Sequence, residues 1–156
     1  MKVLFVCLGN ICRSPAAEAI MRAKLQEAGL SEKFDCDSAG TGAYHVGEKA
    51  DSRMIASAGK RRFGITSIAR QFKHHDFDDF DIIVAMDQSN YDLLTKMTAD
   101  KHQQDKIDKM TKFCSSYHAE DVPDPYYSGQ DGFEQVLDIL EDACTGLMNH
   151  LKTKLN

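Results

Sequence analysis

A run of six residues near the start of the chain, KVLFVC at positions 2–7, narrows the choice of fold more than any other feature. Its β-branched and aromatic residues follow one another without polar alternation, which is typical of a β-strand buried on both faces. The run stops at Gly9 and Asn10. Strands of this kind occur mainly in parallel sheets that carry helices on both sides, so the segment predicts an α/β protein.

Helical and extended patterns alternate along the rest of the chain. A helix is predicted to begin with Ser14 as N-cap and Pro15 as first helical residue, and to end at Gly29. Further strands are expected at residues 34–39, 81–86 and 107–113. Further helices are expected at residues 51–63, closed by Gly64, and from the cap Asp87 to about residue 95.

The last predicted helix has the most regular pattern. Its apolar residues keep one face over about five turns: Phe133, Val136, Leu137, Leu140, Cys144, Leu147 and Leu151. Asp131 as N-cap with Glu134 fits its start. Strands that alternate with helices predict a parallel sheet with right-handed crossovers, and hence a three-layer α/β fold of the flavodoxin-like, doubly wound kind. The length fits one compact domain over residues 1–156.

Charge and cysteine content argue against several classes of protein. Basic and acidic side chains number 19 and 24, a net charge of −5, which disfavours general attraction to nucleic acid or to an anionic membrane. The longest apolar run, residues 3–8, is far shorter than the roughly 20 residues of a transmembrane helix. It is also too short for a signal peptide. Five cysteines without an export signal are expected to stay reduced, so we expect a cytoplasmic protein.

The loop after the first strand, residues 7–14, combines residues that bind and attack an anion. Ligands of such folds bind at the carboxyl ends of strands, and the amides of this loop and of the next helix can surround a tetrahedral oxyanion. Cys7 lies at the positive end of that helix and near Arg13, which favours the nucleophilic thiolate. Arg13 can hold two oxygens of a phosphoryl group.

The position of this motif makes it specific, because the bare Cys-x5-Arg spacing arises by chance in roughly one such chain in five. Gly9 and Asn10 allow the loop to curl around the anion. Position 17 lacks a Glu or Gln that would complete a capping box, so the Ser14 hydroxyl is available to donate to the Cys7 sulfur. The alternative is a core thiol beside a solvated arginine.

A second segment supplies a candidate acid. A thiolate that attacks a phosphate ester needs an acid to protonate the leaving oxygen. Asp124 lies between Pro123 and Pro125, whose restricted backbones stiffen the loop and allow the carboxylate to be aimed. Tyr126 and Tyr127 follow as aromatic walls suited to a flat substrate. Taken alone, the segment is equally consistent with a polar turn before the last helix.

Other polar and thiol residues carry less weight. Asp87 is expected to cap a helix, with contact to the active site as a second possibility. The His-His-Asp sequence at 74–76 lacks a second ligand cluster, so a solvated surface is favoured over a metal site, and residues 60–62 are expected to be a helix-end charge run. Cys12 is close enough to Cys7 for a reversible disulfide after oxidation. The remaining cysteines are expected to be core or partly exposed thiols: Cys36, Cys114 and Cys144.

Five short motifs occur in order over nearly the whole chain. They are VCLGNICRSP at 6–15, SAGT at 38–41, ARQ at 69–71, AMDQSN at 85–90 and DPY at 124–126. Together they resemble the low-molecular-weight protein tyrosine phosphatases. The resemblance implies a four-stranded parallel sheet flanked by helices, and hydrolysis of phosphotyrosine through a phosphocysteine intermediate without a metal or other cofactor.

The resemblance also implies roles and partners. Cys7 would be the nucleophile, Arg13 the clamp on phosphate, and Asp124 the general acid and then the general base. Asn10 and Ser14 would support the loop and the thiolate. Gly9, Ile11 and Cys12 of the loop would bind the phosphate of the substrate. Leu8, Tyr44 and Tyr126 would line the rest of the substrate site. The implied partners are a phosphotyrosine-containing protein and inorganic phosphate or another oxyanion, with no nucleic acid and no membrane.

One departure from the family pattern and two other functions bear on this assignment. Ser67 stands where most relatives carry a histidine that supports the loop through Asn10, so we expect the loop to be held differently. An arsenate reductase on the same scaffold would need a resolving cysteine pair in mid-chain, but no cysteine lies between Cys36 and Cys114. A non-catalytic phosphoprotein-binding module would need no nucleophile and acid together.

Overall fold

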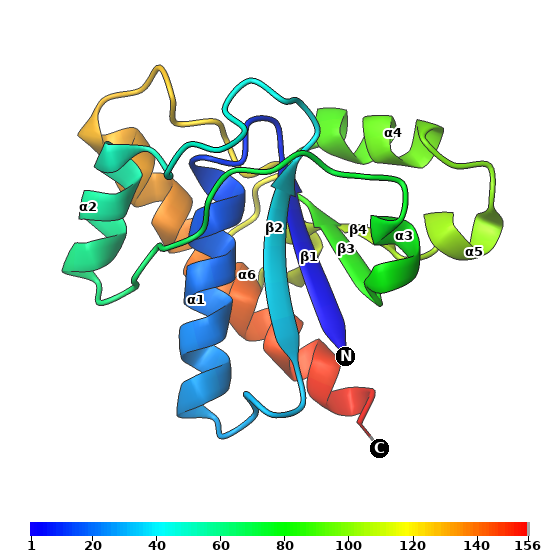
Figure 1. Cartoon of the computed structure of the whole chain (residues 1–156). Helices are drawn as coiled ribbons and strands as arrows, with labels where there is room; N and C mark the ends of the chain where they lie inside the picture. Colours follow the sequence, from blue (N-terminus) through cyan, green and yellow to red (C-terminus); the bar gives the residue numbers. More distant parts are fainter. Residues whose placement is uncertain (156) are drawn as a thin grey trace.

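The computed structural model describes residues 1–155 as four strands, six α-helices and one short 3-10 helix (Figure 1). The strands are β1 (Lys2–Cys7), β2 (Asp35–Gly40), β3 (Ile82–Ala85) and β4 (Ile107–Lys109). The helices are α1 (Arg13–Glu27), α2 (Ser52–Lys60), α3 (Asp76–Asp79), α4 (Gln88–Lys96), α5 (Lys101–Gln104), the 3-10 helix η1 (Met110–Phe113) and α6 (Gln130–Thr153).

The strands form one parallel sheet in the order β2-β1-β3-β4. The last residue of β1, Cys7, pairs with Gly40, the last residue of β2, and Val6 pairs with Ala85 at the end of β3. The carboxyl ends of these three strands therefore meet at one edge of the sheet. The predicted doubly wound α/β fold with four parallel strands is confirmed.

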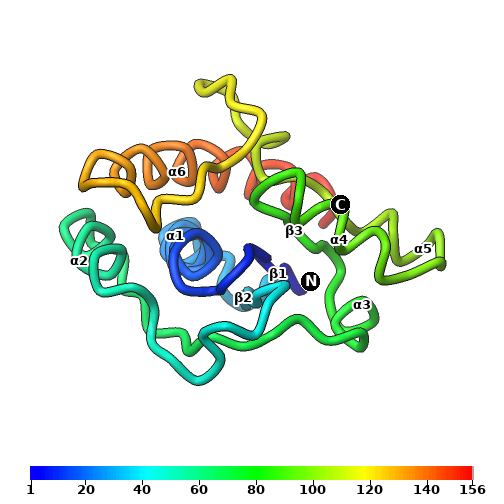
Figure 2. The backbone as a smooth tube through the Cα atoms, turned by 90° about the horizontal axis from the view of Figure 1, so that it is seen from above, coloured from blue at the N-terminus to red at the C-terminus, as the bar shows by residue number. Residues whose placement is uncertain are grey.

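Alternate side chains of β1 enter two separate cores. Val3 and Phe5 lie in the larger core, which residues of α1, α2 and α6 share. Leu4 lies in the smaller core on the opposite face, with Phe77 of α3 and Leu94 of α4. Viewed from above, α1, α2 and α6 lie on one side of the strands and α3, α4 and α5 on the other (Figure 2). Burial on both faces explains why the 2–7 run shows no polar alternation.

The start of α1 differs from the prediction. Cys12 occupies the N-cap position, and Ser14 lies inside the helix. The Ser14 hydroxyl is bonded to the side chains of Cys7 and Asn10 rather than to the backbone of the first turn, so it cannot act as the cap. The predicted end is confirmed, because Gly29 follows the helix with a φ of 70°, the left-handed conformation in which helices commonly stop.

Two other boundaries were wrong. Helix α2 stops at Lys60, before the predicted end at residue 63. Arg62, with a φ of 67°, adopts the left-handed conformation that was expected of Gly64. Of the predicted strand at 107–113, only the first three residues pair in the sheet, and the remainder forms η1. Helices α3 and α5 have four residues each, too few to show a period in the sequence.

Helix α6 covers one face of the sheet with 24 residues. Its predicted apolar face is confirmed, since seven residues are buried: Phe133, Val136, Leu137, Leu140, Cys144, Leu147 and Leu151. The N-cap is Gly129 rather than Asp131, which lies in the first turn, where a negative charge interacts favourably with the helix dipole. Neither α6 nor any other helix within residues 1–155 is long and apolar enough to cross a membrane.

A glycine of α6 makes a close backbone contact that predicts a large loss of stability on substitution. A Cβ added at Gly146 would overlap the backbone carbonyl oxygen of Phe113 in η1. We expect Gly146→Ala to lower the free energy of unfolding by more than about 2 kcal/mol, because the backbone of η1 must move. Urea unfolding measures this.

The control for this prediction is Gly59→Ala in α2, where nothing lies within 4 Å of the added Cβ. There alanine is the better helix former, and we expect a gain of about 0.5–1 kcal/mol. Equal stability of Gly146→Ala and the unmodified protein would show that α6 and η1 are not in close contact.

Candidate active site

The carboxyl ends of the strands adjoin a cavity of about 390 Å³. Nine of the predicted site residues line it: Cys7, Leu8, Gly9, Ile11, Cys12, Arg13, Tyr44, Asp124 and Tyr126. The other two, Asn10 and Ser14, are buried and hydrogen-bond to each other beside Cys7. His45 and Tyr127 complete the lining. Residues from three distant parts of the sequence thus meet at the edge of the sheet where such folds bind ligands.

The sulfur of Cys7 lies among hydrogen-bond donors. The Ser14 Oγ is 3.0 Å from the Sγ, and the backbone amide of Asn10 donates to the Sγ over 3.3 Å. The Asn10 Nδ2 donates to the Ser14 Oγ over 2.8 Å. Because the Ser14 oxygen already accepts that bond, its own proton is available for the sulfur. The sulfur is therefore held by hydrogen-bonding groups from the loop and from the first turn of α1.

The backbone of the loop is held by its carbonyl groups. The carbonyls of Cys7, Leu8 and Ile11 accept hydrogen bonds from backbone amides of the segment between β2 and α2. The donors are, in the same order, Thr41, Gly42 and Asp51. In a trans peptide the N–H points opposite to the C=O. The amides of the residues that follow these carbonyls therefore point away from that segment. Successive amides that point to one side are the kind of arrangement that can bind an anion.

Arg13 is buried at the floor of the cavity, with a side chain only 3% exposed. Its Nη1 donates to Asp87 Oδ2 at 2.6 Å and to the carbonyl oxygen of Val122 at 3.1 Å. Burial opposes the charge, but the interactions with Cys7 and Asp87 outweigh it and raise the pKa of Arg13 above its ordinary value. The guanidinium is thus a fixed positive charge beside the thiol.

Asp87 has two functions in the structure. Its Oδ1 accepts the backbone amide of Asn90 at 2.8 Å and caps α4, as predicted. Its Oδ2 holds Arg13. One carboxylate therefore connects the start of α4 to the anion site.

Asp124 lies next to Arg13 in the lining of the cavity. Its Oδ2 lies 3.7 Å from Arg13 Nη2, and its Oδ1 accepts the amide of Tyr126 at 3.1 Å. The side chain is 45% exposed, so the carboxylate is accessible from solvent and from the cavity. The proline-flanked carboxylate and the arginine predicted from the sequence are thus neighbours.

Arg53 of α2 holds the loop that carries Asp124, and the sequence interpretation missed it. Its Nη2 donates to the carbonyl oxygen of Tyr126 at 3.0 Å and to Asp51 Oδ2 at 2.8 Å. The guanidinium also lies 5.4 Å from the centroid of the Tyr126 ring. Nothing in the sequence joins residues so far apart, because the contact depends on how α2 lies against the loop.

The mouth of the cavity is apolar and aromatic. Leu8, Tyr44 and Tyr127 are exposed there, and Tyr127 is 95% exposed. The rings of Tyr126 and Tyr127 meet edge to face, with centroids 4.9 Å apart. Such a rim suits the flat face of an aromatic ligand.

The 74–76 segment differs from the prediction of a solvated surface, whereas the charge run at residues 60–62 lies at the end of α2, as predicted. Asp76 is buried and pairs with Arg70, although the neighbouring His75 and Asp79 are exposed. Arg61 at the end of α2 pairs with three carboxylates of α6: Glu134, Asp138 and Glu141. Both arginines hold segments together that are distant in the sequence.

The other cysteines are core or partly exposed thiols, as predicted. Burial raises the pKa of both Cys12 and Cys36 to about 12, with the charge of Asp51 adding to the effect at Cys12. These thiols are therefore neutral at physiological pH. The reversible disulfide between Cys7 and Cys12 stays a prediction.

The oxygen of the Asn10 side chain shows how the loop is held in the presence of Ser67. Asn10 Oδ1 accepts the backbone amide of Arg70 at 3.0 Å. Within residues 1–155, no hydrogen bond joins Ser67 to Asn10. Main chain thus supports the loop at this point.

Comparisons with known proteins indicate one family. The sequence profile of the low molecular weight phosphotyrosine protein phosphatases matches residues 2–156. A Synechocystis sp. protein provisionally named a low molecular weight protein-tyrosine-phosphatase is 50% identical over 156 residues, 99% of each chain. A protein tyrosine phosphatase structure from Entamoeba histolytica is 49% identical, with a TM-score of 0.97, and the match covers 100% of this chain and 99% of that chain. The structure of DARP, a drosophila arginine phosphatase, is 32% identical, with a TM-score of 0.91 over 97% and 98% of the two chains.

Proposed function

The chain belongs to the low molecular weight phosphotyrosine protein phosphatase family, and on this basis we propose that it hydrolyses phosphotyrosine in proteins through a phosphocysteine intermediate on Cys7. One observation carries the proposal: the Cys7 thiol, the buried Arg13 and the accessible Asp124 carboxylate line a single cavity. Together they supply a nucleophile, a clamp for phosphate and a proton donor.

In the first step, the Cys7 thiolate attacks the phosphorus, and an S–P bond forms as the P–O bond to the phenol breaks. Both Nη1 protons of Arg13 are directed to Asp87 and Val122. The edge formed by Nε and Nη2 then holds two equatorial oxygens of the phosphoryl group. The loop amides stabilise the remaining charge, which is greatest in the transition state.

Asp124 moves the protons in both steps. It begins protonated and gives its proton to the phenol oxygen as that oxygen leaves, because an unprotonated phenolate is a poorer leaving group. The resulting carboxylate takes a proton from water, which attacks the phosphocysteine. This second attack breaks the S–P bond, releases inorganic phosphate and restores the thiolate and the protonated Asp124.

The substrate class follows from the rim of the cavity. Leu8, Tyr44 and the edge-to-face pair of Tyr126 and Tyr127 present apolar surface to the ring of an aryl phosphate. The proposed partners are a protein bearing phosphotyrosine and, after turnover, inorganic phosphate. We place the reaction in the cytoplasm, because a nucleophilic thiolate needs a reducing compartment.

The experiment that tests this function compares four reactions of the purified protein in excess chelator. We expect hydrolysis of p-nitrophenyl phosphate and of a phosphotyrosine peptide, both inhibited by orthovanadate. We expect turnover of a phosphoarginine peptide to be at least about 100-fold slower, because its side chain has no aromatic ring to contact the rim. We expect arsenate reduction with a thiol donor to be slower by at least the same factor, because the chain lacks a resolving cysteine pair in mid-chain. Faster release from phosphoarginine, or reduction of arsenate at a comparable rate, would overturn the assignment.

A further inference from the structure

We propose that Arg70 is a positioning residue of the reaction: its side chain, held between Asp37 and Asp76, keeps its own backbone amide on Asn10 and thereby fixes the donors at the Cys7 sulfur. The inference rests on the proposed function, in which that sulfur is the nucleophile. It adds a residue that neither lines the catalytic cavity nor touches substrate.

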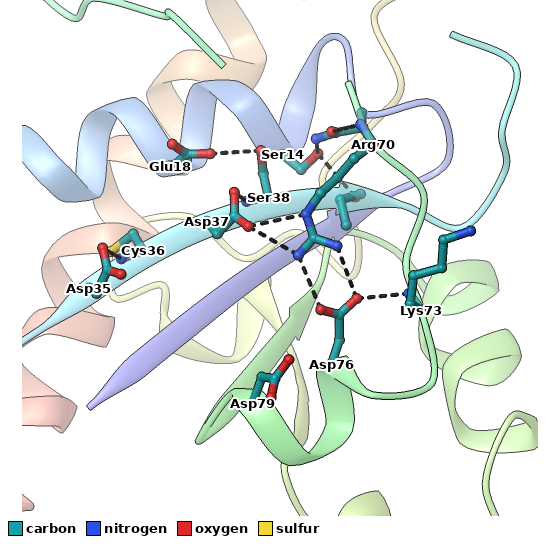
Figure 3. A network of polar contacts seen from close by, with 12 residues as sticks. Ser14, Glu18, Asp35, Cys36, Asp37, Ser38, Arg70, Lys73, Asp76 and Asp79 are labelled. Carbon is teal, nitrogen blue, oxygen red and sulfur yellow. Dashed lines mark hydrogen bonds and ion pairs between the residues drawn. The ribbon is translucent and has the colours of Figure 1, made fainter. Parts of the chain in front are cut away.

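The guanidinium of Arg70 is held on two sides (Figure 3). Its Nε donates to Asp37 Oδ2 at 3.1 Å, and its Nη2 lies 3.0 Å from the same oxygen. On the other side, Nη1 and Nη2 donate to the two oxygens of Asp76 at 3.0 and 3.2 Å, a bidentate pair. The Asp76 side chain is 2% exposed and also accepts the backbone amide of Lys73 at 2.8 Å. A buried carboxylate with these partners fixes the guanidinium.

The backbone of Arg70 is fixed at the edge of the sheet. Its carbonyl accepts the amide of Gly40 at 2.8 Å, and the carbonyl of Gly40 accepts the amide of Phe72 at 2.7 Å. Asp37 belongs to β2, the strand that ends at Gly40. The side-chain clamp and these backbone bonds therefore attach the segment between α2 and α3 to β2 at the place where β2 passes the loop.

Asn10 transmits this placement to the sulfur. Its φ of 56° is a left-handed conformation, which asparagine tolerates better than most residues other than glycine. The Arg70 amide holds Oδ1, which aims Nδ2 at Ser14 and the backbone amide at the Cys7 Sγ. Loss of the Oδ1 contact frees the Asn10 side chain to rotate, and the Ser14 proton loses its direction.

Arg70 lines a different cavity from the reacting groups. That cavity, of about 850 Å³, is lined by Arg70 together with Asp37, Asp76, Ala43 and Val46. Substitution of Arg70 therefore removes no side chain that lines the catalytic cavity. The variants below keep the titratable and charged side chains near the Cys7 sulfur, namely Cys12, Arg13, Asp87 and Asp124.

The test compares Arg70→Gln with Arg61→Gln. Arg61 also bridges several carboxylates, but these are half-exposed and lie on α6 rather than beside the loop. For Arg70→Gln we expect kcat to fall between about 10- and 100-fold with KM changed less than about threefold, since a slightly displaced nucleophile reacts slowly but leaves the phosphate cradle intact. For Arg61→Gln, both constants should stay within about twofold of the unmodified protein, whatever the loss of thermal stability.

A second readout needs no turnover. The rate of alkylation of Cys7 by iodoacetate, followed against pH, reports how strongly the surrounding donors stabilise the thiolate. We expect its midpoint to move to higher pH in Arg70→Gln and to stay in place in Arg61→Gln. Should Arg70→Gln fail to fold, Asp37→Asn removes one charge of the clamp at a half-exposed position and should shift the profile in the same direction by less. Arg70→Lys keeps the charge but cannot form the bidentate pair, so the midpoint of its alkylation profile should fall between those of the unmodified protein and Arg70→Gln.

Two results would overturn the inference. One is an alkylation profile in Arg70→Gln or Asp37→Asn that matches the unmodified protein. The other is an Arg61→Gln variant with the same loss of kcat, which would make the effect one of general stability. Neither result touches the proposed function, because that function is tested separately, by the choice of substrates and by the turnover of Cys7→Ser.

Discussion

Replacement of Cys7 by serine should lower the turnover of a phosphotyrosine peptide by at least about four orders of magnitude. A serine hydroxyl stays protonated where the thiol ionises, so no S–P bond forms and no equally reactive oxygen replaces the sulfur. The loop amides and Arg13 are unchanged, and we expect inorganic phosphate to bind with an affinity within about threefold of the unmodified protein. Steady-state kinetics and titration calorimetry measure the two quantities.

The matched control for Cys7→Ser is Cys114→Ser. Cys114 is half-buried beside α6, and its thiol is bonded to the carbonyl oxygen of Ile139 rather than to the loop. This variant should retain full turnover. Residual activity of Cys7→Ser above about one per cent would remove Cys7 from the role of nucleophile, and loss of phosphate binding in that variant would show that the loop had collapsed instead.

Replacement of Asp124 by asparagine should lower kcat about 100- to 10 000-fold for substrates with poor leaving groups. Asparagine keeps the size of the side chain and an acceptor for the Tyr126 amide, but it has no proton to give at the required acidity. The loss should be smallest for aryl phosphates whose phenols are acidic, because those phenolates leave without protonation. A series of substituted phenyl phosphates measures the slope of log kcat against the pKa of the leaving phenol.

Asp121→Asn controls for the removal of one negative charge near the site. Asp121 lies three residues before Asp124 with a similarly exposed side chain, and it pairs with Lys109 rather than with Arg13. It should leave the slope of the series unchanged. If Asp124→Asn also left that slope unchanged, the proton would come from another group, and Asp124 would be a structural residue of its loop.

The sequence was sufficient for those parts of the site that neighbours in the chain determine. Cys7 and Arg13 lie across one strand-to-helix junction, where a buried strand and a helix start place them together. Asp87 could be identified as a cap because capping depends on residues only three positions apart. The four-stranded parallel sheet followed from buried runs that alternate with amphipathic helices.

Contacts between distant segments could not be predicted in the same way. Arg53, Arg61 and Arg70 each bond to groups more than 30 residues away, and a single sequence gives no signal for such pairing. The sequence suggested a solvated surface around Asp76, because buried and exposed aspartates look alike in a polar stretch. The end of α2 at Lys60 was missed for a related reason: glycine is the usual residue in the left-handed conformation after a helix, and here Arg62 adopts it.

The division of the Asp87 carboxylate between Asn90 and Arg13 limits how the protein can be engineered. A substitution of Asp87 made to stiffen the beginning of α4 would also remove the side chain that holds Arg13, and one made to release Arg13 would also remove the cap of the helix. The stability of α4 and the position of Arg13 therefore cannot be adjusted separately at this residue.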